Sequence, residues 1–368
     1  MEEIITRPTR LLVDLNNFKY NVEQIKKMVA LKGNAKIMPV IKGNCYGTYI
    51  NKITEIMNEF EIVAVAIVDE GVELRKQGYK NEIFVLNQAY KDEIDKIVKY
   101  NISVGTSSKE FISELGKCNE EIKIHLEIGT GMGRTGINPN RTEEYINYIK
   151  EYPNIKVEGI YTHLSSADED YEYTNKQLAS FKVAVDKATN ILGDIKYIHA
   201  SASNGILNFP DSYYTLVRPG IILYGYESCP DMKDKIDLKP VCKLKSKVTF
   251  LKEVGSGISI GYSRSYKTTK ETKVATIPIG YADGLDRMLS NKGYIVINGQ
   301  KAPIIGKICM DSFMADVTDL KTEAKVGDDI YIWDNDLITL EEVANVCDTI
   351  NYEIMSTISS RVPREFIK

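Results

Sequence analysis

Short apolar runs alternate with amphipathic stretches through the first 225 residues of the chain. Each run is too short for a core helix and is typical of a buried parallel strand, which is covered on both faces. The pattern predicts eight strands, at residues 38–41, 62–68, 83–87, 102–106, 123–129, 157–164, 197–203 and 215–225.

The stretches between these strands predict the crossover helices that parallel strands require. The first helix begins after Asp14, a residue type that caps helix N-termini, and the longest lies around residues 173–192. Eight strands that alternate with helices close into a (β/α)8 barrel, so we expect an α/β fold of the TIM-barrel type. A doubly wound open sheet is the alternative, but no GxGxxG follows the first strand, which argues against a dinucleotide-binding domain.

The pattern changes after the last of these strands. Residues 229–239 are polar and have no clear period, and from Leu244 onward strand signals dominate, apart from one helix predicted over residues 340–350. We therefore expect two domains: a barrel formed by residues 1–238 and a mainly antiparallel β-domain formed by residues 239–368.

Composition excludes several classes of function. The net charge of −4 gives no basic face for nucleic acid, and no apolar run approaches the ~18 residues of a membrane span. The N-terminus lacks the pattern of a signal peptide and the six cysteines form no CxxC pair, so we expect a cytoplasmic protein with reduced thiols. The three histidines are not clustered with cysteine or acid, so we expect no metal site.

Polar residues stand where the predicted barrel strands end. In such barrels the catalytic groups come from the C-terminal ends of the strands. Lys42 directly follows the first apolar run, and a lysine desolvated at that point can act as a nucleophile. The strand ends supply the candidate residues Lys42, Tyr46, Arg134, His163, Ser203, Arg218, Gly220 and Ile221.

Each candidate also has a simpler interpretation. Lys42 could be solvated, and His163 could stack on an aromatic cofactor or only form a hydrogen bond at its strand end. Arg218 lies within an apolar run and must meet an anion or an acceptor, which could be a structural salt bridge. The Asn204-Gly205 and Pro219-Gly220 pairs could hold a phosphate through backbone N–H groups or could be plain turns.

The chain resembles the alanine racemase family, whose members are fold-type III enzymes that depend on pyridoxal 5'-phosphate (PLP). The resemblance covers the whole chain and rests on nine motifs in the family's order: VIKGNCYG, GTGMGRTG, YTHLSSAD, HASASNG, VRPGIILYG, ISIGYSRSY, IGYADGLDR, GKICMDSFMADV and NYEIMSTISSRVPR. It implies a (β/α)8 barrel followed by a β-domain, in agreement with the hydrophobic pattern.

The resemblance assigns a cofactor role to residues of the first domain. Lys42 binds PLP covalently, His163 lies beside the pyridine ring, and Arg218 donates to the pyridine nitrogen. Because arginine stays protonated, that nitrogen remains an unprotonated acceptor, which makes a weaker electron sink. The phosphate contacts implied by the family are Tyr46, Ser203, Gly220, Ile221 and Tyr352.

The resemblance also implies racemisation by two bases on opposite faces of the substrate. Lys42 serves the D-face, and Tyr262 of the partner subunit serves the L-face, so we expect an obligate homodimer with composite active sites. The implied reaction is interconversion of L- and D-alanine, and such an enzyme supplies D-alanine as a peptidoglycan precursor. The residues implied on the substrate side are Arg134, Tyr281, Met310 and Asp311.

The chain departs from the family pattern around this substrate side. Many members carry a carbamylated lysine seven residues before the motif arginine, as an anion that holds it. Here that residue is Glu127, which supplies a negative charge directly, so we expect it to support Arg134 without carbamylation. The other departures are Gly43, Cys45, Thr48, Tyr49, Gly129 and Lys307.

Three alternatives remain open because of these departures. The nearest is a broad-specificity or serine racemase of the same family. A fold-type III decarboxylase shares the barrel and β-domain but carries a cysteine–acid pair in a different context. A non-catalytic PLP-binding protein would be a lone barrel without a second domain.

Overall fold

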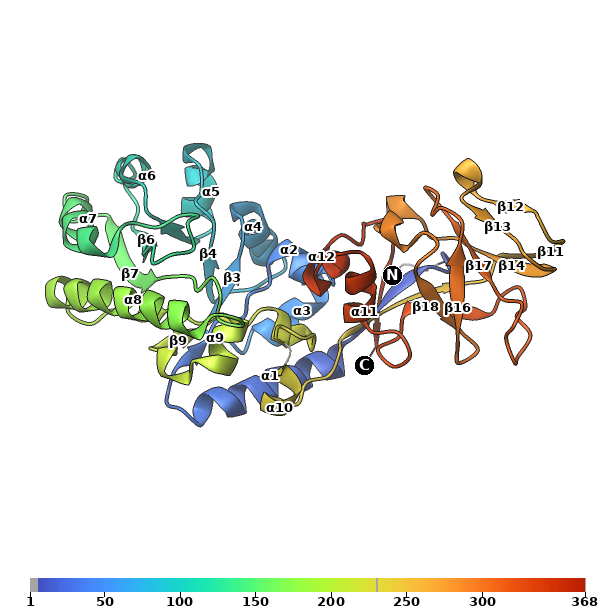
Figure 1. The fold of residues 1–368 in the computed structure, drawn as a ribbon. Coiled ribbons are helices and arrows are strands. Elements are labelled where there is room, and N and C mark those ends of the chain that lie inside the picture. The colour runs from blue at the N-terminus through green and yellow to red at the C-terminus, as the bar shows by residue number, and fades with distance from the viewer. Residues whose placement is uncertain (1–5, 230, 368) are drawn as a thin grey trace.

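The computed structural model describes residues 6–229 and 231–367, and side chains there except those of residues 50–52. The chain forms two lobes side by side (Figure 1). The lobe drawn in blue to yellow-green holds the parallel strands, and the orange lobe holds the second sheet. No helix in the described ranges is long and apolar enough to cross a membrane.

The first lobe is a barrel of eight parallel strands. Six of them form one sheet in chain order, and β2 pairs with β9 in parallel. Parallel bridges from Val40 to Ala64 and from Ala202 to Arg218 join this pair to the two edges of the six-stranded sheet, which closes the barrel. The strands are β2 (Lys36–Ile37), β3 (Ile62–Val65), β4 (Glu82–Val85), β5 (Ser103–Thr106), β6 (Ile122–Glu127), β7 (Ile155–Tyr161), β8 (Tyr197–His199) and β9 (Leu216–Val217).

The (β/α)8 prediction is confirmed, and the alternative of an open doubly wound sheet is wrong. Several predicted strands are shorter in the structure, such as 197–203, where β8 ends at His199, and two runs differ most. The run at 38–41 lies beyond β2, and only Val40 in it forms a bridge; Pro39 has no N–H to give a ladder. The run at 215–225 leaves the sheet after Val217 and forms a 3₁₀ turn at η4 (Ile221–Tyr224), past the Pro219-Gly220 pair.

Helices surround the barrel as predicted. The first begins at Asp14, whose carboxylate accepts a hydrogen bond from the Asn17 N–H at 2.9 Å and so satisfies a free helix donor. The helices are α1 (Leu15–Ala30), α3 (Ile50–Met57), α4 (Val68–Lys76), α5 (Ile94–Lys99), α6 (Lys109–Leu115), α7 (Thr142–Ile149), α8 (Tyr171–Leu192) and α9 (Ser203–Asn208), with the short α10 (Met232–Lys235) inside the predicted linker.

The second lobe is built on a nine-stranded sheet. All neighbouring strands in it are antiparallel except β1 and β19, so the prediction of a mainly antiparallel domain is confirmed. The order is β11 (Phe250–Val254), β14 (Thr272–Ile277), β17 (Phe313–Asp316), β16 (Gln300–Ile305), β15 (Tyr294–Ile297), β18 (Asp329–Trp333), β10 (Cys242–Lys247), β1 (Arg10–Asp14) and β19 (Arg364–Ile367).

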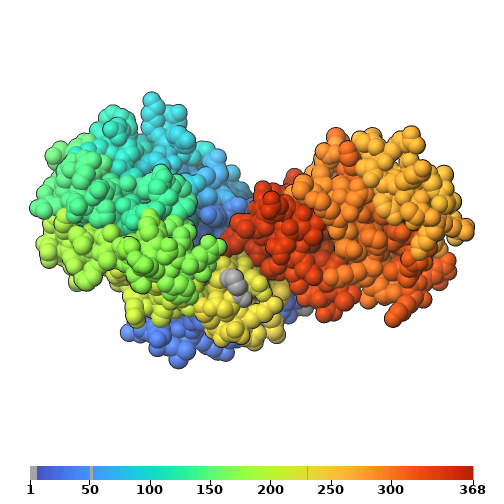
Figure 2. All heavy atoms as spheres, viewed as in Figure 1, coloured from blue at the N-terminus to red at the C-terminus, as the bar shows by residue number. Residues whose placement is uncertain are grey.

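Two features of this lobe differ from the expected order. Strand β1 begins the chain in the second sheet, between β10 and β19, before the chain enters the barrel. The single helix predicted over 340–350 is in fact two helices, α11 (Leu340–Val346) and α12 (Asn351–Ser356), because Asp348 has a φ of 56° and ends the first. Helix α12 lies where the two lobes meet (Figure 2).

Candidate active site

The segment that follows Lys42 is a left-handed turn. Helix α2 (Lys42–Tyr46) has φ values of 62°, 53°, 56° and 52° at its last four residues, Gly43 to Tyr46. A left-handed residue other than glycine costs roughly 1–2 kcal/mol, so Asn44, Cys45 and Tyr46 together cost about 3–6 kcal/mol. Such a turn persists only where its surroundings hold it.

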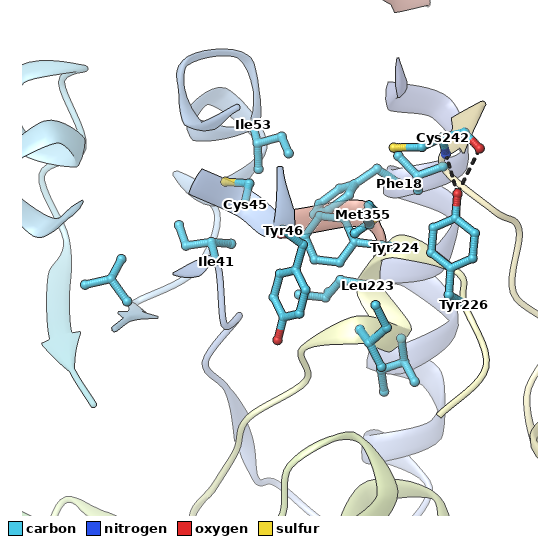
Figure 3. Close-up of a cluster of buried hydrophobic side chains, with 14 of the residues drawn as sticks. Phe18, Ile41, Cys45, Tyr46, Ile53, Leu223, Tyr224, Tyr226, Cys242 and Met355 are labelled. Carbon is cyan, nitrogen blue, oxygen red and sulfur yellow. Dashed lines mark hydrogen bonds between the residues drawn. The ribbon is translucent and has the colours of Figure 1, made fainter. Parts of the chain in front are cut away.

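The surroundings include a buried cluster under the turn (Figure 3). Cys45 and Tyr46 are buried, and the Tyr46 ring lies 4.8 Å from the Tyr224 ring, which in turn meets Phe18 of α1 edge-on at 5.4 Å. Met355 of α12 belongs to the same cluster. The turn therefore rests on side chains from both lobes.

The turn places Lys42 and Tyr46 in one cavity at the C-terminal ends of the barrel strands. The cavity has a volume of about 280 Å³. Arg134 also lines it. So does every residue predicted to contact the cofactor, namely Lys42, Tyr46, His163, Ser203, Arg218, Gly220, Ile221 and Tyr352. One concave site with converging polar groups is the usual form of a small-molecule site.

One end of the cavity is shaped for an anion. The Gly220 N–H donates to Ser203 Oγ at 3.1 Å, which leaves the serine hydroxyl proton free to point elsewhere. A Cβ at Gly220 would stand 2.5 Å from the Tyr46 hydroxyl oxygen, so the absence of a side chain keeps this space open. Burial raises the pKa of both Tyr46 and Tyr352, so both phenols stay protonated and can donate to a phosphate.

Arg218 is buried in the cavity wall and bonded to neutral acceptors. Its Nη2 donates to the carbonyls of Thr162 at 2.8 Å and Ala200 at 2.9 Å, and its Nη1 donates to His199 Nδ1 at 2.9 Å. It forms no ion pair with any described residue, so the alternative of a structural salt bridge is wrong. Its Nε has no hydrogen-bond partner in the described ranges and is left for a ligand. Burial lowers the Arg218 pKa to about 10, which keeps the group charged at neutral pH.

The three histidines form a neutral environment around Arg218. Because Arg218 donates to His199 Nδ1, the His199 proton is on Nε2 and points to His125 Nδ1, 2.8 Å away. Burial, with the positive charge of Arg218, lowers the pKa of His163 to about 3. Burial and nearby cations lower the pKa of His125 to about 3 as well. His163 Nδ1 lies 3.4 Å from Arg218 Nη2, which places a flat, uncharged ring in the cavity wall.

Lys42 has the electrostatic surroundings of a nucleophile. Its side chain is exposed at the cavity, yet nearby protein atoms displace part of the water around its amine. This desolvation lowers its pKa, Arg134 and Arg218 lower it further, and Glu70 opposes them. A lowered pKa leaves a larger share of the amine unprotonated at neutral pH.

Glu127 meets the Arg134 loop differently from the expected ion pair. Its Oε1 accepts a hydrogen bond from the Thr135 hydroxyl at 2.7 Å, and Arg134 itself forms no ion pair within the described residues. Burial raises the Glu127 pKa, and the hydrogen bond from Thr135, followed by the charge of Arg134, counters part of this rise. Glu127 thus reaches the loop through Thr135, and its support of Arg134 stays a prediction.

The predicted substrate-side residues of the second lobe do not line this cavity. Tyr262 is 68% exposed and directly follows Gly261, just beyond β12 (Ser259–Ile260). Strand β12 lies in the part of the orange lobe that is far from the barrel (Figure 1). Tyr281 and Met310 are both exposed. Their segments lie side by side, because the Tyr281 N–H donates to the Cys309 carbonyl at 3.1 Å and the Ala282 N–H to the Met310 carbonyl at 3.0 Å. Asp311 pairs with Arg361 at 2.7 Å.

Sequence reasoning missed several residues of the cavity wall. Tyr161 is the last residue of β7, two residues before His163, and continued strand alternation would put both side chains on the same side, a signal that the sequence could have given. Asp168 and Asn204 also line the cavity, and Asn204 Oδ1 is buried without a partner in the described ranges. Nothing in the local pattern marks Asp168, whereas Asn204 belongs to the Asn204-Gly205 pair considered for a phosphate from the sequence, and both residues of that pair line the cavity.

Comparisons with known proteins match both domains of the chain to one family. Residues 13–228 match the family described as alanine racemase, N-terminal domain, and residues 241–366 match alanine racemase, C-terminal domain. An alanine racemase of Halothermothrix orenii is 39% identical over 100% of this chain and 98% of its own length.

Solved structures give the same result. An alanine racemase of Clostridium difficile 630 is 34% identical with a TM-score of 0.94, covering 99% of this chain and 97% of its own. One from Bartonella henselae, with covalently bound pyridoxal phosphate, is 29% identical with a TM-score of 0.88, covering 98% of this chain and 99% of its own.

Proposed function

The chain belongs to the alanine racemase family, and we propose that it interconverts L- and D-alanine with PLP held at Lys42. The observation that carries this proposal is the single cavity that gathers Lys42, Tyr46, His163 and Arg218 with an anion-shaped end at Gly220. A lysine amine, a buried guanidinium with a free Nε and a recess lined by hydroxyl groups are the contacts that PLP requires.

The residues present fit the cofactor. Lys42 would bind it covalently, and the hydroxyls of Tyr46, Tyr352 and Ser203 would hold its phosphate beside Gly220 and Ile221. His163 would flank the ring, and Arg218 Nε would donate to the pyridine nitrogen. PLP, when bound, supplies an electron-withdrawing ring that weakens the Cα–H bond of an attached amino acid.

Two bases then act on opposite faces of the substrate. Lys42 Nζ takes or returns the Cα proton on one face, and the hydroxyl of Tyr262 of the partner subunit does so on the other. Arg134 and the partner subunit's Met310 would bind the carboxylate, and the partner subunit's Tyr281 would narrow the entrance, with the partner subunit's Asp311 beside it. The exposure of Tyr262, Met310 and Tyr281 outside their own chain's cavity supports an obligate homodimer.

The wider setting follows from the family. We propose that the division of the chain into residues 1–238 and 239–368 holds for the two domains, with β1 as a strand that the first segment lends to the second sheet. All six cysteines are free thiols, which supports a cytoplasmic location. The product D-alanine would serve as a peptidoglycan precursor.

The proposal is tested with purified protein and added PLP in deuterated buffer. L-alanine, L-serine, L-lysine and L-arginine are each incubated while optical rotation and Cα deuterium are followed. Rapid loss of rotation with alanine far above the others is the expected result. Equal loss over several amino acids would make it a broad-specificity racemase, and PLP binding without racemisation would contradict the proposal.

A further inference from the structure

The left-handed turn of Lys42 ends at a carbonyl held by a distant arginine. The turn closes at Gly47, whose carbonyl accepts a hydrogen bond from Arg364 Nε at 2.8 Å, across 317 residues of sequence. The remaining Arg364 donors bind the carbonyls of Ser359, Val362 and Ile358, each at 2.6 Å. One guanidinium therefore joins the end of the turn to the last loop of the second domain.

Arg364 is buried to an extent that is unusual for its charge. Its side chain is 7% exposed, burial lowers its pKa, and it forms no ion pair with a described carboxylate. Its charge is met by four carbonyl oxygens and by the Tyr49 ring, whose centre lies 4.4 Å away. Burial of a cation without a counter-charge costs free energy. We therefore take its role to be the connection of the two segments to which it donates hydrogen bonds.

The turn is held on its other sides as well. The Asn44 N–H donates to Glu70 Oε1 at 3.2 Å, while Glu70 Oε2 accepts from the Ala66 N–H at 2.8 Å. Glu70 thus ties the turn to the start of α4. A Cβ at Gly47 would collide with the Met355 carbonyl, so the turn lies directly against α12, the helix that carries Tyr352.

We propose that Arg364 is a positioning residue that holds the Lys42–Gly47 turn in its left-handed form and sets it against α12. We call Arg364, its four carbonyl partners and the Tyr49 ring the clamp. Lys42, Tyr46 and Tyr352 all line the cofactor cavity, so the clamp fixes the lysine and two phosphate-binding phenols relative to one another. The second domain thereby shapes the cofactor site of its own chain. The inference rests on the proposed function, because it assigns Arg364 to the PLP site.

The chain offers a matched control in Arg75. This arginine also donates only to carbonyls: Nε to Tyr100 at 2.8 Å, Nη1 to Tyr79 at 2.9 Å and Asn81 at 2.7 Å, and Nη2 to Asn101 at 2.9 Å. Those loops precede β4 and β5, so they lie at the opposite end of the barrel strands from Lys42. Loss of Arg75 removes the same kind of bonds without touching the turn.

The experiment compares R364Q and R75Q in the full chain. Three quantities are measured: the Tm, the PLP dissociation constant from the absorbance of the lysine-bound cofactor, and amide hydrogen exchange in residues 43–49 of the cofactor-free protein. Both variants should lower the Tm. Only R364Q should weaken PLP binding tenfold or more and accelerate exchange in residues 43–49 at least tenfold.

The outcomes separate this inference from the proposed function. If R364Q and R75Q match in PLP affinity and in exchange of residues 43–49, the inference is wrong while racemisation stands. If the unaltered protein binds no PLP, the proposed function fails, and the exchange comparison alone decides the clamp. Should R364Q not fold, Y49L removes only the aromatic face of the clamp; it should accelerate exchange there about threefold, and unchanged exchange would overturn the proposal.

Discussion

Gly220→Ala tests whether the recess at the end of the cavity holds the cofactor phosphate. The new Cβ would lie 2.5 Å from the Tyr46 hydroxyl oxygen, against an ordinary contact of 3.4 Å or more. The phenol would therefore have to retreat by roughly 1 Å. It has little room to do so, because the Tyr46 ring is buried between Tyr224 at 4.8 Å and Tyr352 at 6.2 Å.

The expected effect follows from the hydrogen bond that Tyr46 gives to the phosphate. A hydrogen bond to a charged group is worth about 1.5–3 kcal/mol, so its loss should weaken PLP binding roughly 10- to 150-fold. The assay is titration of the cofactor-free protein with PLP, followed by absorbance. Gly255→Ala is the control, because a Cβ there would meet no atom within 4 Å.

A double variant makes the reasoning refutable. In Tyr46→Phe the hydroxyl is gone, so the clash and the hydrogen bond disappear together, and Gly220→Ala should cost little further affinity. Strictly additive losses, or wild-type PLP affinity in Gly220→Ala, would show that Tyr46 and Gly220 do not form the phosphate recess.

Three further predictions concern the bases, the loop and the histidines. Tyr262→Phe should bind PLP normally but lose about 10²–10⁴-fold in racemisation in both directions, because each direction needs both bases. The Cα proton of D-alanine should still exchange through Lys42 in deuterated buffer, and wild-type racemisation would remove Tyr262 as a base. Glu127→Gln keeps an acceptor for Thr135 but removes a negative charge near Arg134. The KM for alanine should therefore rise about fivefold, or ~1 kcal/mol, in steady-state kinetics. An unchanged KM would show that Glu127 does not support Arg134. The pKa values of the three histidines in the folded protein lie below the ordinary value. The unfolded chain therefore binds more protons than the folded protein from about pH 6.5 down to pH 3. Acidification in that window should lower the free energy of unfolding by up to ~1.4 kcal/mol per pH unit for each histidine. Histidine NMR at pH 5 should find all three rings neutral, and a protonated ring would contradict this.

The barrel and most of the residues that line its cavity could be predicted because they depend on local pattern. Short apolar runs mark strands, and polar residues at the ends of such runs lie at the mouth of a barrel, which is how Lys42 and His163 were found. Arg218 was found as a charge within an apolar run. Tyr161 was missed although strand alternation with His163 pointed to it. The split of the predicted helix at Asp348 depends on one positive φ that composition does not mark.

Other features depend on contacts between distant segments. Strand β1 joins the second sheet through β10 and β19, partners more than 200 residues away. The left-handed turn needs three non-glycine residues at positive φ, which no local propensity favours, and its clamp by Arg364 comes from the last strand. The chain from Arg218 through His199 to His125 likewise forms only when three strands come together.

The central claim is that one active site takes Lys42 from one subunit and Tyr262 from the other. The most direct test is a heterodimer, isolated with two different tags, of a Lys42→Ala chain and a Tyr262→Phe chain. If the sites are composite, one of the two active sites in the heterodimer carries both substitutions and the other carries neither. The heterodimer should therefore regain about half of the wild-type activity per dimer. Activity no higher than that of the two parent homodimers would mean that both residues act within one chain, and would contradict the account.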